Sequence, residues 1–107
     1  MDRGDADAAI RNFNAALLIN PKNPGVYYNR AVAYINKNDI PKAVADLDAA
    51  IRLDPKFMSA YAARSTAYMK LGQYDKSWRD VETVEKLGVK MKPEFLDELR
   101  RLSGKGK

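Results

Sequence analysis

The chain repeats itself with a period of about 34 residues, and this period constrains its fold more than any other feature of the sequence. Aligning residues 1–54 with residues 35–88 gives thirteen identical pairs, against roughly one in sixteen positions expected by chance. The matches include proline, aromatic and charged positions: Pro21/Pro55, Tyr27/Tyr61, Tyr34/Tyr68, Arg30/Arg64 and Asp46/Asp80. Tandem units of this length stack so that each one buries its apolar face against the next, which predicts a solenoid.

Turn-forming residues divide each unit into two helices. Asn23 before Pro24 predicts an N-cap followed by proline at the first helical position. Asp39 is a suitable N-cap for the next helix, and Gly88 fits a helix C-terminus. With errors of about two to four residues at each boundary, we predict helices at 5–19, 25–37, 40–53, 58–71, 74–87 and 93–102.

These repeated positions resemble the tetratricopeptide repeat (TPR) family. In unit 24–57 the matching residues are Tyr27, Ala31, Tyr34, Asp39, Ala43, Leu47, Ala50 and Pro55. In unit 58–91 they recur as Tyr61, Ser65, Tyr68, Gly72, Tyr74, Ser77, Val81 and Val84. The resemblance implies an all-α, right-handed helical-hairpin solenoid. It divides a single TPR domain, 1–107, into a half repeat 1–23, repeats 24–57 and 58–91, a cap helix 92–103 and a flexible tail 104–107.

The later unit departs from the family pattern, which indicates that the array ends there. Val84 replaces a small residue, and Gly88 stands where Asp-Pro is expected. Pro93 then opens a helix with apolar residues on one face, which resembles the solvating cap helix of such arrays: Phe95, Leu99 and Leu102.

The family consists of protein-binding scaffolds, so the resemblance implies a concave groove for a peptide or partner helix, lined by the first helix of each unit. The groove positions carried over to this chain are small or weakly polar: Tyr28, Asn29, Val32, Ile35, Asn36, Ser59, Ala62, Ala63, Thr66, Met69 and Lys70. Tyr28 is the best anchor candidate, with room beside it at Ala62 and Ala63. The alternative is that these positions are only the solvated sides of their helices, because affinity requires anchors.

An arginine recurs on the apolar face of each first helix. Arg30 lies among Tyr27 and Tyr34, and Asp46 follows it in the antiparallel second helix of the same unit. A charge on a packed face is costly unless it is paired. We therefore predict the ion pairs Arg30–Asp46 and Arg64–Asp80, with an anion site in the groove as the alternative.

One subfamily of TPR domains clamps the acidic C-terminus of heat-shock chaperones with asparagines and basic residues. Asn29 matches one clamp asparagine, but the two basic positions of the next helix fall on Ser59 and Ala63. A carboxylate needs charge-assisted donors to offset its desolvation. We therefore expect no strong binding to an acidic chaperone tail.

The helix at 5–19 lacks a hairpin partner in this sequence. Its apolar residues Ile10, Phe13, Leu17 and Leu18 are expected to be partly uncovered, and exposed apolar patches mark association surfaces. Two alternatives follow: a homodimer through this helix, or a fragment of a longer array with no independent activity.

Composition narrows the function classes. With no cysteine and no histidine, most zinc sites, Cys/His pairs and the Ser-His-Asp triad are excluded, so we expect no metal and no cofactor. The acids Asp46, Asp48, Asp80 and Glu82 have no adjacent base, which argues against catalysis. We expect that the protein is not an enzyme.

The net charge of +5 belongs mostly to the C-terminal end, because residues 86–107 alone carry +4. Arg100, Arg101 and the lysine tail could bind a nucleic acid, but no aromatic residues are interleaved with them, so this is disfavoured. Apolar runs are too short for a membrane span, and no signal peptide is visible. The compartment stays open, with the cytoplasm favoured.

Overall fold

The computed structural model describes residues 3–104, and within that range the chain forms six helices and no strand. They are α1 (Arg3–Ile19), α2 (Pro24–Asn36), α3 (Ile40–Leu53), α4 (Met58–Lys70), α5 (Tyr74–Lys86) and α6 (Pro93–Ser103). All six predicted helices are confirmed, with their ends close to the expected positions. The predicted tail lies outside the described residues, except for Gly104.

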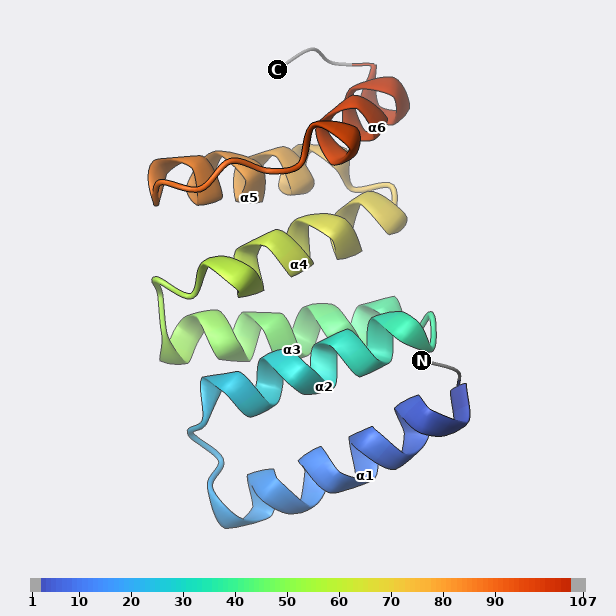
Figure 1. The fold of residues 1–107 in the computed structure, drawn as a ribbon, viewed down its shortest axis with the longest axis vertical. Helices are drawn as coiled ribbons and strands as arrows, with labels where there is room; N and C mark the ends of the chain where they lie inside the picture. The colour runs from blue at the N-terminus through green and yellow to red at the C-terminus, as the bar shows by residue number, and fades with distance from the viewer. Residues whose placement is uncertain (1–2, 105–107) are drawn as a thin grey trace.

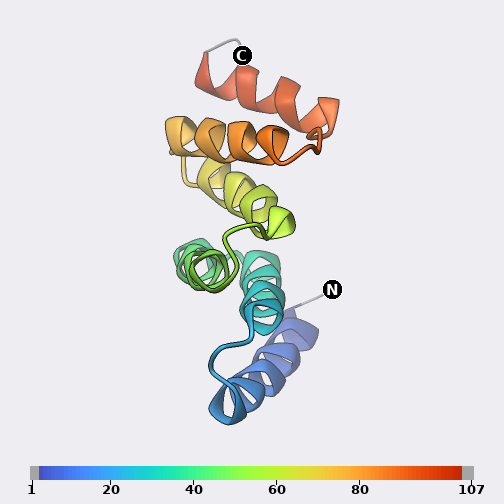
Figure 2. The same cartoon turned by 90° about the vertical axis from the view of Figure 1, so that its left-hand side faces the viewer.

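The helices run back and forth and stack along one axis, from α1 at one end to α6 at the other (Figure 1). The molecule is elongated, with extents of 43 × 28 × 18 Å. Figure 2 shows the same rise from α1 to α6 from the side. The helix contacts join mainly neighbours in the sequence, together with a contact between α2 and α4. This is the all-α helical-hairpin solenoid expected from the repeat.

Alanines allow α2 and α3 to approach closely. Ala31 of α2 and Ala43, Leu47 and Ala50 of α3 are fully buried in one cluster, which Ala60 of α4 completes. Larger side chains pack around its edge, among them Tyr27, Tyr28, Tyr34 and Ile35. The spacing of small and large residues therefore joins the α2–α3 hairpin to α4 in one cluster.

The helix boundaries follow local chemistry at most of the predicted positions. Asn23 caps α2, since its side-chain oxygen accepts a hydrogen bond from the Val26 backbone N–H at 3.3 Å. Asp39 stands at the N-cap of α3 but makes no side-chain capping bond; its carboxylate instead lies 3.6 Å from the Lys42 ammonium. Gly88 follows α5 with φ of 97°, a conformation that glycine adopts without strain.

A separate apolar cluster seats the last helix. Leu99 is fully buried with Trp78 and Val81 of α5, and Phe95 and Leu96 pack beside them. The prediction of the apolar face of α6 is therefore only partly correct. Leu102 is 38% exposed, and Leu96 takes its place, because the helix presents positions 95, 96 and 99 to α5.

The first helix packs on α2 through a third cluster of Ala6, Ile10 and Ala33. Ile10, which we expected to be partly uncovered, is buried at 8% exposure, and Phe13 packs half-buried against the cluster. Leu17 is half-buried, and Leu18 is exposed at 88%, as expected. Ile19, which was not among the predicted residues, is exposed at 87%.

Candidate functional site

The recurring arginines lie at the seam between helices. Arg30 of α2 donates two hydrogen bonds to the Asp46 carboxylate of α3, from Nε to Oδ2 at 2.8 Å and from Nη2 to Oδ1 at 2.7 Å. Its remaining Nη1 donates to Asn14 Oδ1 of α1 at 2.9 Å. One guanidinium thus joins three successive helices.

The next repeat reproduces this arrangement. Arg64 of α4 donates from Nε and Nη2 to Asp80 of α5 at 2.9 and 2.8 Å, and from Nη1 to Asp48 of α3 at 2.8 Å. Asn14 and Asp48 occupy the same position in successive repeats. Each arginine therefore bonds to the helix after its own and to the helix before it, and only the forward partner was predicted from the sequence.

Tyrosine rings cover both guanidinium groups. The Arg30 Cζ lies 5.7 Å from the Tyr27 ring centroid and 6.0 Å from that of Tyr34. The hydrogen bond to Asp46 is the main cause that raises the pKa of Arg30, against an opposing effect of burial. The same causes raise the pKa of Arg64 beside Asp80. Each guanidinium donates three hydrogen bonds inside the array, which favours the predicted ion pairs over an anion site at these arginines.

A cavity of about 470 Å³ opens between the first helices of the two hairpins and the segment that joins α5 to α6. Its lining is mostly apolar: Tyr28, Met58, Ser59, Ala62, Ala63, Thr66, Val84, Val89, Lys90, Met91, Lys92 and Phe95. The volume falls within the range of about 300–1,000 Å³ typical of ligand pockets. Figure 1 shows the joining segment returning alongside α5 before α6 begins.

The predicted groove residues divide into two groups. Five of them line the cavity: Tyr28, Ser59, Ala62, Ala63 and Thr66. The other six do not: Asn29, Val32, Ile35, Asn36, Met69 and Lys70. Asn29, Asn36 and Lys70 are exposed, Val32 is half-buried, and Ile35 and Met69 pack against core clusters.

The tyrosine proposed as an anchor is held in place by an aromatic neighbour. The Tyr28 ring lies 5.2 Å from the Phe57 ring, with the planes tilted by 39°. Because Phe57 occupies the N-cap of α4, this contact links α2 to the start of α4. Tyr28 is half-buried, so one part of its surface stays available at the cavity wall.

The segment that joins α5 to α6 contributes a side of the cavity that the sequence analysis did not predict. Val89, Lys90, Met91 and Lys92 all line the cavity. Its counterpart in the preceding unit is the shorter segment 54–57, which joins α3 to α4. The sequence carried two signals, namely the lysine that recurs at Lys22, Lys56 and Lys90 and the excess of basic residues after position 86.

Metal-binding groups and membrane spans can be assessed within residues 3–104. This part of the chain holds no group of three or more acidic, histidine or cysteine side chains arranged to bind a metal ion. None of its helices combines the length and the apolar character that a membrane span requires.

Comparisons with known proteins agree with this geometry. No curated protein matches the sequence. The first TPR domain of Spaghetti (RPAP3), solved with the HSP90 peptide SRMEEVD, is 30% identical with a TM-score of 0.84, and the match covers 94% of this chain and 79% of that one. The second TPR domain of human RPAP3, solved with the HSP70 peptide SGPTIEEVD, is 29% identical with a TM-score of 0.82, covering 95% and 84%.

A further solved structure shares the fold. The TPR2B domain of yeast Sti1 is 24% identical with a TM-score of 0.76, over 94% of this chain and 82% of that one. A model of the tetratricopeptide repeat matches residues 1–64. The repeat period, the stacked hairpins and these matches lead to one conclusion: the chain belongs to the tetratricopeptide repeat family.

Proposed function

We propose that this protein is an interaction scaffold that binds a segment of a partner protein in the cavity between α2, α4 and the α5–α6 segment. TPR domains similar to this one have been solved with peptides bound. The observation that carries the proposal is the cavity itself, which is concave, mostly apolar and lined by Tyr28 and the small residues Ala62 and Ala63.

Small side chains line the cavity, so a single substitution to a large residue can fill part of it. Random peptides of about twelve residues, displayed on phage by their C-terminal end, are selected on the immobilised chain. We expect Ala62→Trp to lower the affinity for the selected peptides at least about tenfold, because the indole would occupy the space of the peptide side chain. Fluorescence anisotropy with the labelled peptides measures the change.

Ala45→Trp is the matched control, since Ala45 is exposed on α3 and lies outside the cavity lining. It should leave the affinity unchanged, and both variants should keep the helical circular dichroism spectrum. Selected peptides that bind Ala62→Trp as well as they bind the original chain would contradict the proposal.

The acidic chaperone tail is the second candidate ligand, because two of the similar structures hold peptides that contain EEVD. The objection from the sequence was that the matching positions Ser59 and Ala63 offer no cation. In the folded chain, however, cations are present near these positions, because Lys90 and Lys92 line the same cavity as Ser59 and Ala63. Both lysines are exposed, however, and exposed ion pairs contribute only about 0.2–1 kcal/mol each.

We therefore propose that the chain binds such tails only weakly. A peptide ending in EEVD should bind with a dissociation constant above about 10 μM, and Ser59→Lys/Ala63→Arg should tighten it at least about tenfold by restoring charge-assisted donors on α4. Isothermal titration calorimetry measures both affinities, with an amidated peptide as the control for the terminal carboxylate. Tighter binding by the unmodified chain would overturn this expectation.

A further inference from the structure

A second cavity, which we call the arginine cavity, lies on the side of α4 opposite to the proposed peptide cavity. Its volume is about 160 Å³, and its lining residues are Arg64, Tyr68, Lys76, Arg79 and Asp80. Each of its two α4 residues follows a lining residue of the peptide cavity by two positions, which is about half a turn of an α-helix. The two cavities therefore open on different faces of the solenoid.

The arginine cavity carries more positive than negative charge. Three cations and one carboxylate line it. Asp80 accepts two hydrogen bonds from Arg64, and Asp48 accepts the third, so both carboxylates are engaged by one guanidinium. Lys76 and Arg79 are exposed and form no salt bridge in the part of the chain that the structure describes. Their charge is therefore available to a ligand.

The cations are held in place by the tyrosine between the two helices. The Tyr68 ring centroid lies 5.7 Å from the Arg64 Cζ and 5.6 Å from the Lys76 Nζ, within the range of cation–π contacts. A guanidinium has five N–H groups, and three of those on Arg64 donate to carboxylates. Two N–H groups of a side chain that lines the cavity thus keep their capacity to donate.

The preceding repeat lacks part of this arrangement. Four positions are the same in both units: Arg30/Arg64, Tyr34/Tyr68, Lys42/Lys76 and Asp46/Asp80. Arg79, however, stands where the preceding unit has Ala45. Gln73 likewise replaces Asp39, whose carboxylate lies 3.6 Å from the Lys42 ammonium. One change adds a cation, and the other removes the acid that pairs with the equivalent lysine.

The geometry points to a binding site for a single phosphoryl group, either free phosphate or a phosphate monoester, in which Lys76 and Arg79 bind its oxygens and Arg64 donates from the floor. A phosphoryl group carries a charge of about −1.5 to −2 and three strong acceptor oxygens, and arginine binds such oxygens through paired N–H groups. The cavity has roughly five times the 30 Å³ that one water molecule occupies in the liquid, so one such group fits.

A titration with inorganic phosphate tests the site directly. The chain is labelled with ¹⁵N and followed by two-dimensional NMR at pH 7.5, with sodium chloride adjusted to hold the ionic strength constant. The Arg79 Nε–H and the backbone N–H groups of 76–80 should shift saturably, with a dissociation constant on the order of 1–10 mM, since two of the cations are exposed. Shifts of the same size with chloride alone would overturn the assignment.

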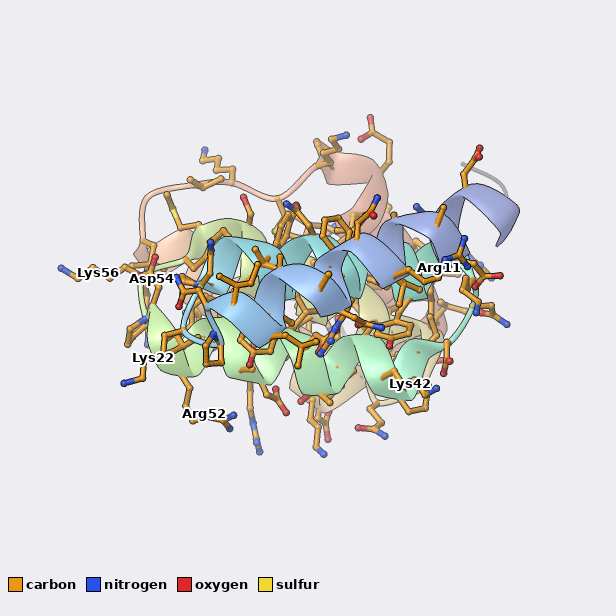
Figure 3. All side chains as sticks on the ribbon, turned by 90° about the horizontal axis from the view of Figure 1, so that it is seen from below. Arg11, Lys22, Lys42, Arg52, Asp54 and Lys56 are labelled. Atoms are coloured by element: carbon orange, nitrogen blue, oxygen red, sulfur yellow. The ribbon has the colours of Figure 1, made fainter. Side chains whose placement is uncertain are left out.

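The double variant Lys76→Ala/Arg79→Ala should weaken phosphate binding at least about fivefold. Arg52→Ala/Lys56→Ala is the matched control, because it removes the same charge from exposed positions that do not line the arginine cavity. Figure 3 labels Arg52 and Lys56 toward one end of α3 and Lys42, the equivalent of Lys76, toward the other. An equal loss in both double variants would show only an effect of net charge and would overturn the site.

The preceding repeat offers a test by gain of binding. Asp39→Gln/Ala45→Arg gives that unit the residues of the arginine cavity. Ala45 is exposed, and Asp39 makes no side-chain capping bond, so α3 should form as before. We expect a second set of saturable shifts at 42–46. The absence of this second set would overturn the assignment of phosphate binding to these side chains.

Two further arms identify the source of the phosphoryl group and separate this site from the proposed function. A short capped peptide with a central phosphoserine, compared with its unphosphorylated form, should bind more tightly than inorganic phosphate if a partner chain is the source. Equal or weaker binding would identify free phosphate. Ala62→Trp, which fills the peptide cavity, should leave phosphate binding unchanged. Loss of phosphate binding in this variant would place the anion in the peptide cavity and overturn the site.

Discussion

At the scale of single residues, the repeated arginines show how a charge is kept on the packed side of a helix. Asp46 and Asp80 have side chains that are only 8% and 4% exposed, and each accepts two hydrogen bonds from its arginine. Removing one partner of a buried pair is costly, because the other charge stays buried. Exposed pairs contribute far less.

We expect Asp80→Asn to lower the free energy of unfolding by about 1.5–3 kcal/mol. The amide cannot accept two charged hydrogen bonds from Arg64, although Asp48 still accepts one. Urea unfolding near neutral pH measures the change. Asp97→Asn at the exposed Asp97–Arg100 pair is the control and should change stability by less than about 0.5 kcal/mol. Equal effects in the two variants would contradict this account of the buried pair.

At the scale of helices, α6 closes the end of the solenoid. Its contact with α5 depends on Leu99, which is fully buried. The Trp78 indole N–H also donates to Ser103 Oγ at 3.2 Å. Since the chain contains a single tryptophan, its fluorescence reports directly on whether α6 is in place. The α5–α6 segment lines the cavity, so docking of α6 and the shape of the site are linked.

Leu99→Ala should destabilise the protein by about 2–4 kcal/mol, because it leaves a cavity in a fully buried position. The Trp78 emission should shift to longer wavelength as water reaches the indole. Leu102→Ala, at a partly exposed position of the same helix, should cost less than about 1 kcal/mol and leave the emission unchanged. Chemical unfolding followed by fluorescence measures both quantities. An unshifted emission in Leu99→Ala would show that α6 stays docked without this contact.

At the scale of the whole molecule, each helix contacts mainly its sequence neighbours, so the two end helices have one packed side each. At the α6 end the exposed positions are mostly polar. At the α1 end Leu18 and Ile19 are almost fully exposed. Exposed apolar side chains of this kind can join two copies of a chain. A homodimer through α1 is therefore the alternative to binding a partner in the groove.

If α1 joins two copies, Leu18→Ser/Ile19→Ser should abolish a dimer that forms as the concentration rises. The substitution should not reduce the free energy of unfolding of the monomer appreciably, because neither side chain is buried. Sedimentation velocity over a wide range of concentration measures the association. Leu53→Ser, another exposed leucine away from α1, serves as the control. A monomer at the highest concentration would remove this alternative.

Much of the fold could be predicted from the sequence, because its information is local and repeated. The repeat period, the prolines and the alanines define the helices and their pairing. The equal spacing of Arg30–Asp46 and Arg64–Asp80 indicates two equivalent pairs, since antiparallel helices in a hairpin bring such positions face to face. The partner Asn14 was missed because it belongs to the previous hairpin, although its own repeat at Asp48 was a usable signal.

Periodicity and short-range spacing are enough to predict the family, the helices and the pairing within each hairpin, and all three could be inferred from the sequence without the tertiary structure. The lining of the cavity depends instead on tertiary packing. Ile35 and Met69 have groove positions by register, yet they pack against core clusters and do not line the cavity, whereas Lys90 and Lys92 of the α5–α6 segment do line it. The path of a connecting segment follows from the packing of α6 on α5, and no repeat register encodes that packing.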